Sequence, residues 1–256
     1  MNERILAIDA GNTRVKWGLN LDYTWLHRGA ATTAEFVRQP QLLDLLAMHH
    51  VDHVVVSNVA GTAVAQAIAE LLQPLGKTAN FVVARARQCG VMNGYDEPSR
   101  LGSDRWAALI ATHVAATSKP RPHLVVMAGT AVTIDALTAD GYFLGGVIMP
   151  GTRLMRSVLN SATAQLPLSD GIYQAFPTNT DNAITSGTIE ACAGAIARQY
   201  TQLTNKLGSS PQCVASGGGM QELVVYLPFP VSINDNLVLD GLLAIARSRN
   251  PAHQDF

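Results

Sequence analysis

Extracellular, membrane-spanning and zinc-binding proteins carry features that this sequence lacks. Its 256 residues include only three cysteines, Cys89, Cys192 and Cys213, which form no CxxC pair. An odd number of scattered thiols argues against a disulfide framework or a zinc site, and it fits a reducing cytoplasm. No apolar run approaches the roughly 20 residues that a membrane-spanning helix needs. The N-terminus, MNERILAID, reaches charged residues too early to resemble a signal peptide.

Charge is also scarce in this chain. Charged residues make up 14% of the sequence, hydrophobic residues 48%, and the formal net charge is -1. Such a composition is typical of a folded chain rather than a disordered one, and the length suits one large domain or two small ones. A near-neutral chain without a long basic run offers no attractive field for nucleic acid. We therefore expect no nucleic-acid partner and no membrane association.

The first half of the sequence predicts a sheet followed by alternating helices and strands. The β-branched run from Val54 to Val59 predicts a buried parallel strand. Apolar residues at helical spacing predict a helix over 33–48, with Thr33 as its cap. The other expected elements are an antiparallel meander of strands over 4–8, 15–21 and 26–30, helices over 61–72 and 105–116, and a strand over 80–84.

The pattern restarts near the middle of the chain. After the breaker KPRPH, the segment HLVVMAGTA resembles the earlier ILAIDAGNT, and Gly129 takes the place of Gly11. Two halves that each begin with a strand and a glycine turn indicate an internal duplication. We therefore expect an α/β fold with two domains, residues 1–118 and residues 119–256. The second domain is expected to contain strands over 124–127, 141–148 and 213–216, helices over 151–160, 180–207 and 237–247, and a frayed tail from 251.

The two glycine turns carry small polar residues that suit phosphate binding. Backbone N–H groups in such turns can point at phosphate oxygens, because glycine permits close approach. Asp9 ends a strand, where it could ligate Mg²⁺ directly or through water, and Lys16 could neutralise phosphate charge. The full sets are Asp9, Gly11, Asn12, Thr13 and Lys16 in the first turn, and Gly129, Thr130 and Thr133 in the second.

Turns that face each other from two halves would clamp a triphosphate in the cleft between them. The alternative is that each turn is only a hairpin, but the matched positions of the pair favour phosphate binding. Neither turn is a Walker A loop, because GxxxxGK[ST] is absent, and no GxGxxG follows a strand. These absences disfavour a P-loop or a Rossmann fold.

A second polar segment, NGYDEPSRLGSDRWAA, leads from a loop into a helix. Asp104 lies at the expected helix start, where an acid is favoured electrostatically, so capping alone would explain it. The functional alternative is a catalytic base that takes the proton of a hydroxyl acceptor during phosphoryl transfer. The neighbouring Arg105 could bind a carboxylate or a phosphate.

Two further motifs permit both a structural and a functional interpretation. In CVASGGGM a strand runs into Gly217 and Gly218, which could form a flexible turn or a bare backbone surface for adenine or ribose. In HHVDH the histidine spacing could bind a metal, but no supporting acid or cysteine pattern accompanies it. A surface turn is the better interpretation of this second motif.

Taken together, these motifs resemble the type III pantothenate kinases, which belong to the acetate and sugar kinase, Hsp70 and actin superfamily. The resemblance rests on DAGNTRVKWG, GSDRWAA, AGTAVTID, GGVIMPG and NLVLDGL, and it extends from Ile5 to about Leu242. It implies two duplicated ribonuclease-H-like halves with ATP in the interdomain cleft. It also implies phosphorylation of the 4′ hydroxyl of pantothenate, the first step towards coenzyme A.

The resemblance assigns roles to particular residues. Asp104 matches the general base, and Arg105 is suited to the substrate carboxylate. It implies ATP and Mg²⁺ as cofactors, and a homodimer whose substrate pocket is completed by the second subunit. The phosphate motifs are matched by Asp9, Asn12, Thr13, Lys16 and Thr130, and the pantothenate segment by Tyr95, Gly102, Ser103, Asp104 and Arg105. Thr180 matches a further threonine that contacts the substrate.

One position departs from the family pattern. Many members carry an acid two residues before the second glycine, where it binds a monovalent cation, but this chain has Met127. A thioether is a poor ligand for a hard alkali cation, so we expect weak or no dependence on K⁺ or NH₄⁺. Asp135, which we expect at the end of the same strand, is a fallback acid at a different spacing. The alternatives to a pantothenate kinase are another small-molecule kinase of the superfamily, or a nucleotide-binding accessory protein without turnover.

Overall fold

A computed structural model describes residues 3–38, 50–116, 118, 120–163, 166 and 170–248. The chain forms two compact units. Unit 1 consists of the described residues up to Ser118 together with those from Asn236 to Ser248, and unit 2 consists of the described residues of 119–235. No helix in the described ranges is both long enough and apolar enough to cross a membrane.

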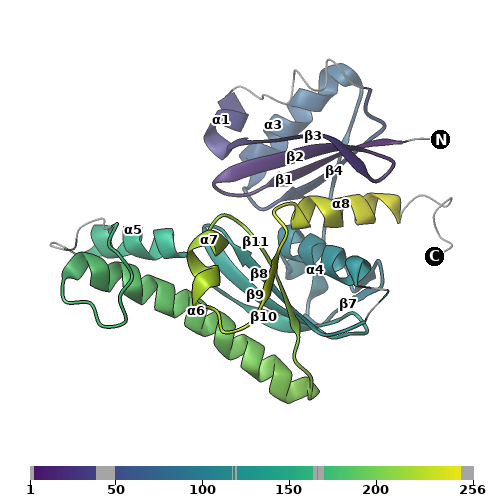
Figure 1. Ribbon diagram of the computed structural model, residues 1–256. Helices are drawn as coiled ribbons and strands as arrows, with labels where there is room; N and C mark the ends of the chain where they lie inside the picture. The colour runs from purple at the N-terminus through teal and green to yellow at the C-terminus, as the bar shows by residue number, and fades with distance from the viewer. Residues whose placement is uncertain are drawn as a thin grey trace. The chain divides into compact units, whose positions relative to one another are not determined.

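Unit 1 is built on a five-stranded sheet with the order β3-β2-β1-β4-β5 (Figure 1). Its strands are β1 (Arg4–Ala10), β2 (Arg14–Leu21), β3 (Thr24–Thr32), β4 (His53–Asn58) and β5 (Ala79–Phe81). The first three pair antiparallel, as the predicted meander requires, and β4 and β5 add in parallel next to β1. The short strands β6 (Arg87–Gln88) and β7 (Val91–Asn93) form a hairpin after it.

Helices cover both faces of this sheet (Figure 1). They are α1 (Thr33–Arg38) and α3 (Thr62–Leu72) on one face, and α4 (Ser103–Ala115) and α8 (Leu237–Arg247) on the other. Leu6 and Ile8 of β1 pack with Phe36 and Ile68 in the core beneath α1 and α3. Because side chains alternate along a strand, Asp9 belongs to the opposite face, the one that α4 and α8 cover.

The closing helix α8 belongs to unit 1, which differs from the expected division at 119–256. It packs against β1, β4 and α4, because its apolar face completes the cover of the first sheet. A Cβ atom on Gly241 would lie only 1.9 Å from the carbonyl oxygen of Ala107, so the two helices meet at backbone distance. Asp240 of α8 also accepts a hydrogen bond from the Trp25 indole at 3.1 Å. The predicted boundary in the middle of the chain is unaffected.

Unit 2 repeats the strand topology of unit 1. Its strands are β8 (His123–Ala128), β9 (Ala131–Leu137), β10 (Tyr142–Pro150), β11 (Gln212–Ser216) and β12 (Val231–Ile233), in the order β12-β11-β8-β9-β10. The strands β8, β9 and β10 form an antiparallel meander, and β11 and β12 add in parallel, as β4 and β5 do in unit 1. The helices are α5 (Thr152–Ala162), α6 (Thr180–Leu207) and the short α7 (Met220–Leu223).

The register shows which residues correspond between the two units. In unit 1, Asp9 lies opposite Lys16 of β2 and next to Ser57 of β4. In unit 2, Met127 lies opposite Thr133 of β9 and next to Ser216 of β11. Met127 therefore occupies the place of Asp9, as the comparison of the two sequence segments predicts. The expectation that Asp135 ends the same strand as Met127 is wrong, because the chain turns at Gly129 and Thr130 and Asp135 lies on β9.

One detail of the helix expected over 33–48 differs from the prediction, and part of that helix is not described. The described part of that helix is α1, and residues 39–49 lie outside the described residues, as does the expected frayed tail. The cap is Thr32 rather than Thr33. The hydroxyl of Thr32 accepts from the Glu35 N–H at 3.2 Å, and the Glu35 carboxylate accepts from the Thr32 N–H at 2.9 Å, which is a capping box. Thr33 instead donates its hydroxyl proton to the carbonyl of Gly11 at 2.7 Å.

Candidate active site

Two carboxylates, Asp9 and Asp104, approach each other in unit 1. Asp9 ends β1, and Asp104 lies in the first turn of α4, on the face of the sheet towards which Asp9 projects. Desolvation, and after it the negative charge of Asp104, raise the pKa of Asp9 from 3.8 to about 7, although Lys16 acts in the opposite direction. A carboxyl group whose pKa lies near neutral pH, next to a second acid, is typical of sites that bind cations or transfer protons.

The position of Asp104 is set by the start of α4. The N-cap residue is Gly102, which has no capping side chain, and Asp104 Oδ1 accepts the N–H of Arg105 at 2.8 Å. A Cβ atom on Gly102 would lie 2.6 Å from that same oxygen, so a larger residue would displace the carboxylate. Asp104 therefore benefits from the helix N-terminus, as the capping interpretation requires, without filling the cap position itself. Capping and catalysis are compatible here.

A buried hydroxyl pair fixes this helix start to the sheet. Ser57 Oγ and Ser103 Oγ lie 2.9 Å apart, and both side chains are buried. Ser57 is the strand neighbour of Asp9, and Ser103 directly precedes Asp104. The pair thus ties the strand beside Asp9 to the residue before Asp104. No sequence motif predicts a role for Ser57, whose only signal is that it is a polar residue at the end of an otherwise apolar parallel strand.

A buried cationic side chain, Arg105, lies at the helix start. Arg105 is only 4% exposed, and its Nη1 donates to the Tyr95 hydroxyl at 2.8 Å. Its guanidinium carbon lies 5.7 Å from the centroid of the Tyr95 ring, within the range of a cation–π contact. The loop that carries Tyr95 is held by Asn93, whose side chain accepts the Tyr95 N–H at 3.0 Å and donates to the Pro98 carbonyl at 3.2 Å. A buried guanidinium of this kind suits an anionic ligand.

The first glycine turn is a closed connection between β1 and β2. The N–H of Gly11 donates to the Arg14 carbonyl at 3.0 Å, and Asn12 and Thr13 are exposed at its tip. The turn is therefore a hairpin, as the simpler interpretation states. Its polar side chains and Lys16 nevertheless lie close to the end of β1 that carries Asp9, because Lys16 is the direct cross-strand partner of Asp9.

The second turn, in unit 2, is contacted by another backbone segment but is not buried by it. Gly129 donates its N–H to the Ala131 carbonyl at 2.9 Å, and Gly129 and Thr130 remain exposed. A Cβ atom on Gly151 would lie 2.4 Å from the Gly129 carbonyl oxygen. Thr133 is 8% exposed, and among the described residues no partner accepts or donates a hydrogen bond at its hydroxyl.

In the glycine run after β11, close packing against Ala128 explains why glycine is needed at Gly217. Gly217 has φ +99°, and a Cβ atom there would lie 2.3 Å from the Ala128 carbonyl oxygen, so only glycine fits. A Cβ atom on Gly218 would meet nothing within 4 Å, which leaves its backbone open to a ligand. Thr180 is the exposed first residue of α6 and lines a cavity of about 860 Å³ with residues of α5 and α6.

The histidine motif has no metal-site geometry in the described residues. His50 Nε2 lies 3.0 Å from Asp52, and His53 Nε2 lies 3.7 Å from Glu3, with both histidines exposed. His49 lies outside the described residues. Within the described ranges, no three side chains of His, Cys, Asp or Glu gather where they could hold a metal.

Known proteins resemble this chain in both sequence and structure. The protein family described as type III pantothenate kinase matches residues 5–202. The chain belongs to this family. A type III pantothenate kinase of Aromatoleum aromaticum is 47% identical over 95% of this chain and 98% of its own. The corresponding protein of Nitrosospira multiformis is 44% identical over 96% of this chain and 92% of its own.

Solved structures share the fold. A protein of Campylobacter jejuni, named as a Baf family transcriptional activator, has a TM-score of 0.59 at 19% identity, covering 95% of this chain and 98% of its own. A protein of Sinorhizobium meliloti, named as a 2-dehydro-3-deoxygalactonokinase, has a TM-score of 0.62 at 16% identity, covering 96% and 99%. At these identities the likeness concerns the fold alone. With the repeated strand topology, it confirms the predicted α/β architecture of two ribonuclease-H-like units.

The raised pKa of Asp9 predicts how replacing it changes stability with pH. Between about pH 4 and pH 7 the folded state holds a proton that the unfolded chain has released, so stability falls as pH rises through this window. Asp9→Asn removes that cost. We expect Asp9→Asn to leave Tm unchanged near pH 4 and to raise it by roughly 5 °C at pH 8, measured by calorimetry.

Asp52→Asn is the matched control, because its shift has the opposite sign. The Asp52 carboxylate accepts a hydrogen bond from the Arg4 N–H at 2.8 Å. Chiefly because of this bond, the pKa of Asp52 lies below its ordinary value of 3.8. Stability from Asp52 is present above its ordinary pKa and is lost as pH falls, so Asp52→Asn should lower Tm at pH 8. An equal loss of Tm in both variants would contradict the assignment for Asp9.

Proposed function

We propose that this protein transfers the γ-phosphoryl group of ATP to the 4′ hydroxyl of pantothenate. The product would be 4′-phosphopantothenate, and the reaction would be the first step of coenzyme A synthesis. Membership of the type III pantothenate kinase family carries the choice of reaction and substrate. Within the chain, the proposal rests on the approach of Asp104 to Asp9 beside the buried cation of Arg105.

Asp104 would be the general base. The backbone around Gly102 leaves space for its carboxylate, and the hydroxyl pair of Ser57 and Ser103 anchors the residue before it. A fixed carboxylate can orient an attacking hydroxyl and take its proton as the bond to phosphorus forms. Most of the rate enhancement would then come from positioning and from electrostatic stabilisation of the transferring group.

Mg²⁺ is the expected metal, and the residues present fit it. The end of β1 holds Asp9 close to a second carboxylate, and the mutual repulsion that helps raise the pKa of Asp9 would be relieved by a divalent cation. Mg²⁺ in kinases is held by one or two carboxylates, waters and substrate phosphates, so a three-residue protein cage is not needed. When bound, the ion would neutralise charge on the phosphates. Asp9 would hold it directly or through water.

The phosphates of ATP would contact both glycine turns. Asn12, Thr13 and Lys16 would supply donors from the first turn, with Gly11 permitting close approach. Gly129, Thr130 and the unpartnered hydroxyl of Thr133 would supply the second. The open backbone at Gly218, beside Gly217, would lie against the nucleoside.

Pantothenate would be held by its carboxylate and its polar chain. Arg105, supported by the Tyr95 hydroxyl, offers a buried guanidinium for a carboxylate. Gly102 and Ser103 form the backbone beside it. Thr180 would contact the substrate across a homodimer interface.

A homodimer would also cover apolar surface in unit 2. Val158 of α5 lines the same cavity as Thr180 and is 51% exposed. Phe176, which precedes the lining residue Pro177, is 92% exposed. Large exposed apolar side chains near a cavity are typical of protein–protein interfaces. Light scattering would give twice the 27.2 kDa chain mass if this proposal holds, and a monomeric mass would oppose it.

Purified protein with ATP, Mg²⁺ and pantothenate tests the activity and its base together. We expect ADP release to depend on pantothenate, with 4′-phosphopantothenate identified by mass spectrometry. Asp104→Asn, which keeps shape and removes the base, should lower kcat by roughly 10²–10⁴-fold with Tm preserved. Near-wild-type turnover in Asp104→Asn would refute the base assignment.

The same assay separates the alternatives. A panel of other alcohol acceptors would reveal another small-molecule kinase through ADP release without pantothenate. ATP binding without turnover on any acceptor would favour an accessory protein. Rescue of growth in cells that lack their own pantothenate kinase would support the proposal in vivo.

Met127 predicts a response to monovalent cations. The position that corresponds to Asp9 carries a thioether, with the hydroxyl-bearing Thr133 and Ser216 as its strand neighbours. Asp135 is fully buried and lies on β9 two residues after Thr133, the cross-strand partner of Met127. Two residues of strand correspond to about 7 Å along β9. We expect turnover at fixed Mg²⁺ to change less than about twofold when K⁺ or NH₄⁺ replaces a bulky organic cation. Activity only with K⁺ or NH₄⁺ would refute this expectation.

A further inference from the structure

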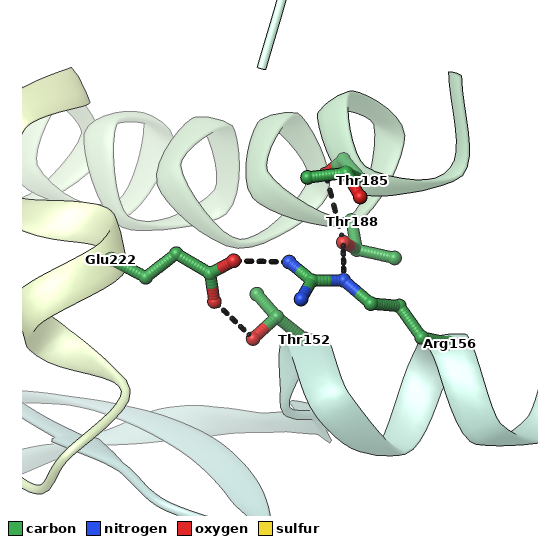
Figure 2. A network of polar contacts seen from close by, with 5 residues as sticks. All are labelled: Thr152, Arg156, Thr185, Thr188 and Glu222. Atoms are coloured by element: carbon green, nitrogen blue, oxygen red, sulfur yellow. Dashed lines mark hydrogen bonds and ion pairs between the residues drawn. The ribbon is translucent and has the colours of Figure 1, made fainter. Parts of the chain in front are cut away.

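A buried polar network joins three helices of unit 2 (Figure 2). Arg156 of α5 forms an ion pair with Glu222 of α7, and Arg156 Nε donates to the Thr188 hydroxyl of α6 at 3.3 Å. The second carboxylate oxygen of Glu222 accepts from the Thr152 hydroxyl at 2.7 Å. Thr188 in turn donates to the Thr185 carbonyl at 3.0 Å. Arg156 and Thr188 are each less than a tenth exposed.

Both ends of this network continue directly into the backbone around the second glycine turn. Thr152 follows Gly151, whose N–H donates to the Thr130 carbonyl at 2.8 Å. Glu222 follows the glycine run, in which Gly219 donates its N–H to the Ala128 carbonyl at 3.0 Å. The Gly129–Thr130 turn is therefore held on one side by Gly151 and on the other by the segment 217–219.

The side chains of Thr152 and Glu222 connect these two supports to each other. Without that connection, the start of α5 and the glycine run would each contact the turn independently. With it, they form a closed frame around the turn, and Arg156 anchors the frame to the long helix α6 through Thr188. Preorganised backbone donors bind anions better than mobile ones, because no ordering remains to be done on binding.

We propose that Glu222, bridging Thr152 and Arg156, is a positioning residue that holds the Gly129–Thr130 turn and the glycine run in the geometry that binds ATP. The inference rests on the proposed function, because it takes these two segments as nucleotide contacts. Glu222 acts through backbone supports and touches neither ATP nor pantothenate. Its loss should therefore weaken nucleotide binding and leave the acceptor contacts of Asp104 and Arg105 in unit 1 unchanged.

The competing explanation is that the network only stabilises unit 2. A buried ion pair gives little net stability compared with well-packed apolar residues, although removing one partner alone is strongly destabilising. A purely stabilising role would lower Tm and the yield of folded enzyme while leaving the KM values of the folded fraction unchanged. KM values and Tm therefore distinguish the two roles.

The test compares Glu222→Gln with wild type in full-length enzyme. Glutamine keeps the size and can still accept from Thr152, but it loses the charge that holds Arg156. We expect the KM for ATP, and the Kd for ATP measured by calorimetry without pantothenate, to rise roughly tenfold. The KM for pantothenate should change less than about twofold. Glu190→Gln is the matched control, because Glu190 of α6 bonds to the Tyr173 hydroxyl outside the frame.

Thr152→Val provides a second variant in case Glu222→Gln folds poorly. Valine matches the shape of threonine and removes only the hydroxyl bond to Glu222, while the ion pair stays intact. We expect a smaller rise of about threefold to fivefold in the Kd for ATP, and no added effect in the double variant beyond that of Glu222→Gln. The shared bond would make the two changes non-additive.

Unchanged ATP affinity in both variants would overturn the inference, as would an equal rise in the KM for pantothenate. These results are distinct from a failure of the proposed function. Wild-type enzyme that binds ATP but does not phosphorylate pantothenate would refute the proposed reaction, while the Kd comparison would still test the frame. Wild-type protein that binds no ATP would refute both.

Discussion

The two-residue alternation along paired strands decides which side chains reach the site. In β1 it sends Leu6 and Ile8 into the core beneath α1 and α3 and turns Asp9 towards the face that α4 covers. A slip of one residue would turn the carboxylate into that core and move Leu6 and Ile8 out of it, to the opposite face. The same register aligns Ser57 and Lys16 with Asp9. The anchor for α4, the cation beside the acid and the acid itself therefore depend on one pattern of backbone hydrogen bonds.

The placement of the two acids in unit 1 lowers the stability of the folded state above about pH 7. Asp9 and Asp104 repel each other in a poorly hydrated position, which a chain selected for stability alone would avoid. Local features hold the acids there nonetheless. The absence of a side chain at Gly102 leaves space for Asp104, the helix N-terminus favours its charge, and the Ser57–Ser103 pair fixes the first residue of α4. Strain of this kind at a site is consistent with a function that a cation and a substrate complete.

Unit 2 uses the same topology for a different purpose. Where unit 1 has Asp9 and Lys16, unit 2 has Met127 and Thr133. At these positions the second sheet therefore has neither a carboxylate nor a lysine ammonium group. Its turn is instead supported by close backbone contacts from Gly151 and Gly217, which only glycine permits. The charged groups of this region lie behind the turn, in the network of Arg156 and Glu222. The two units thus share a strand topology but differ in the side chains at the end of the first strand and in how the following turn is supported.

The sequence by itself determined most of the elements, the duplication and the family, although it did not predict β9 or β12. The two-residue period of strands and the 3.6-residue period of helices are local patterns of apolar residues, so β1, α6 and α8 could be predicted closely. The match of Gly11 with Gly129 indicated the internal repeat. Asp9, Asp104 and Arg105 could be identified because their motifs are contiguous. Only the tertiary structure showed that α8 joins unit 1, that Ser57 meets Ser103, and that Glu222 bonds with Thr152 and Arg156. These contacts join residues that lie far apart in the sequence, and no local pattern records which distant partner a buried polar group will find.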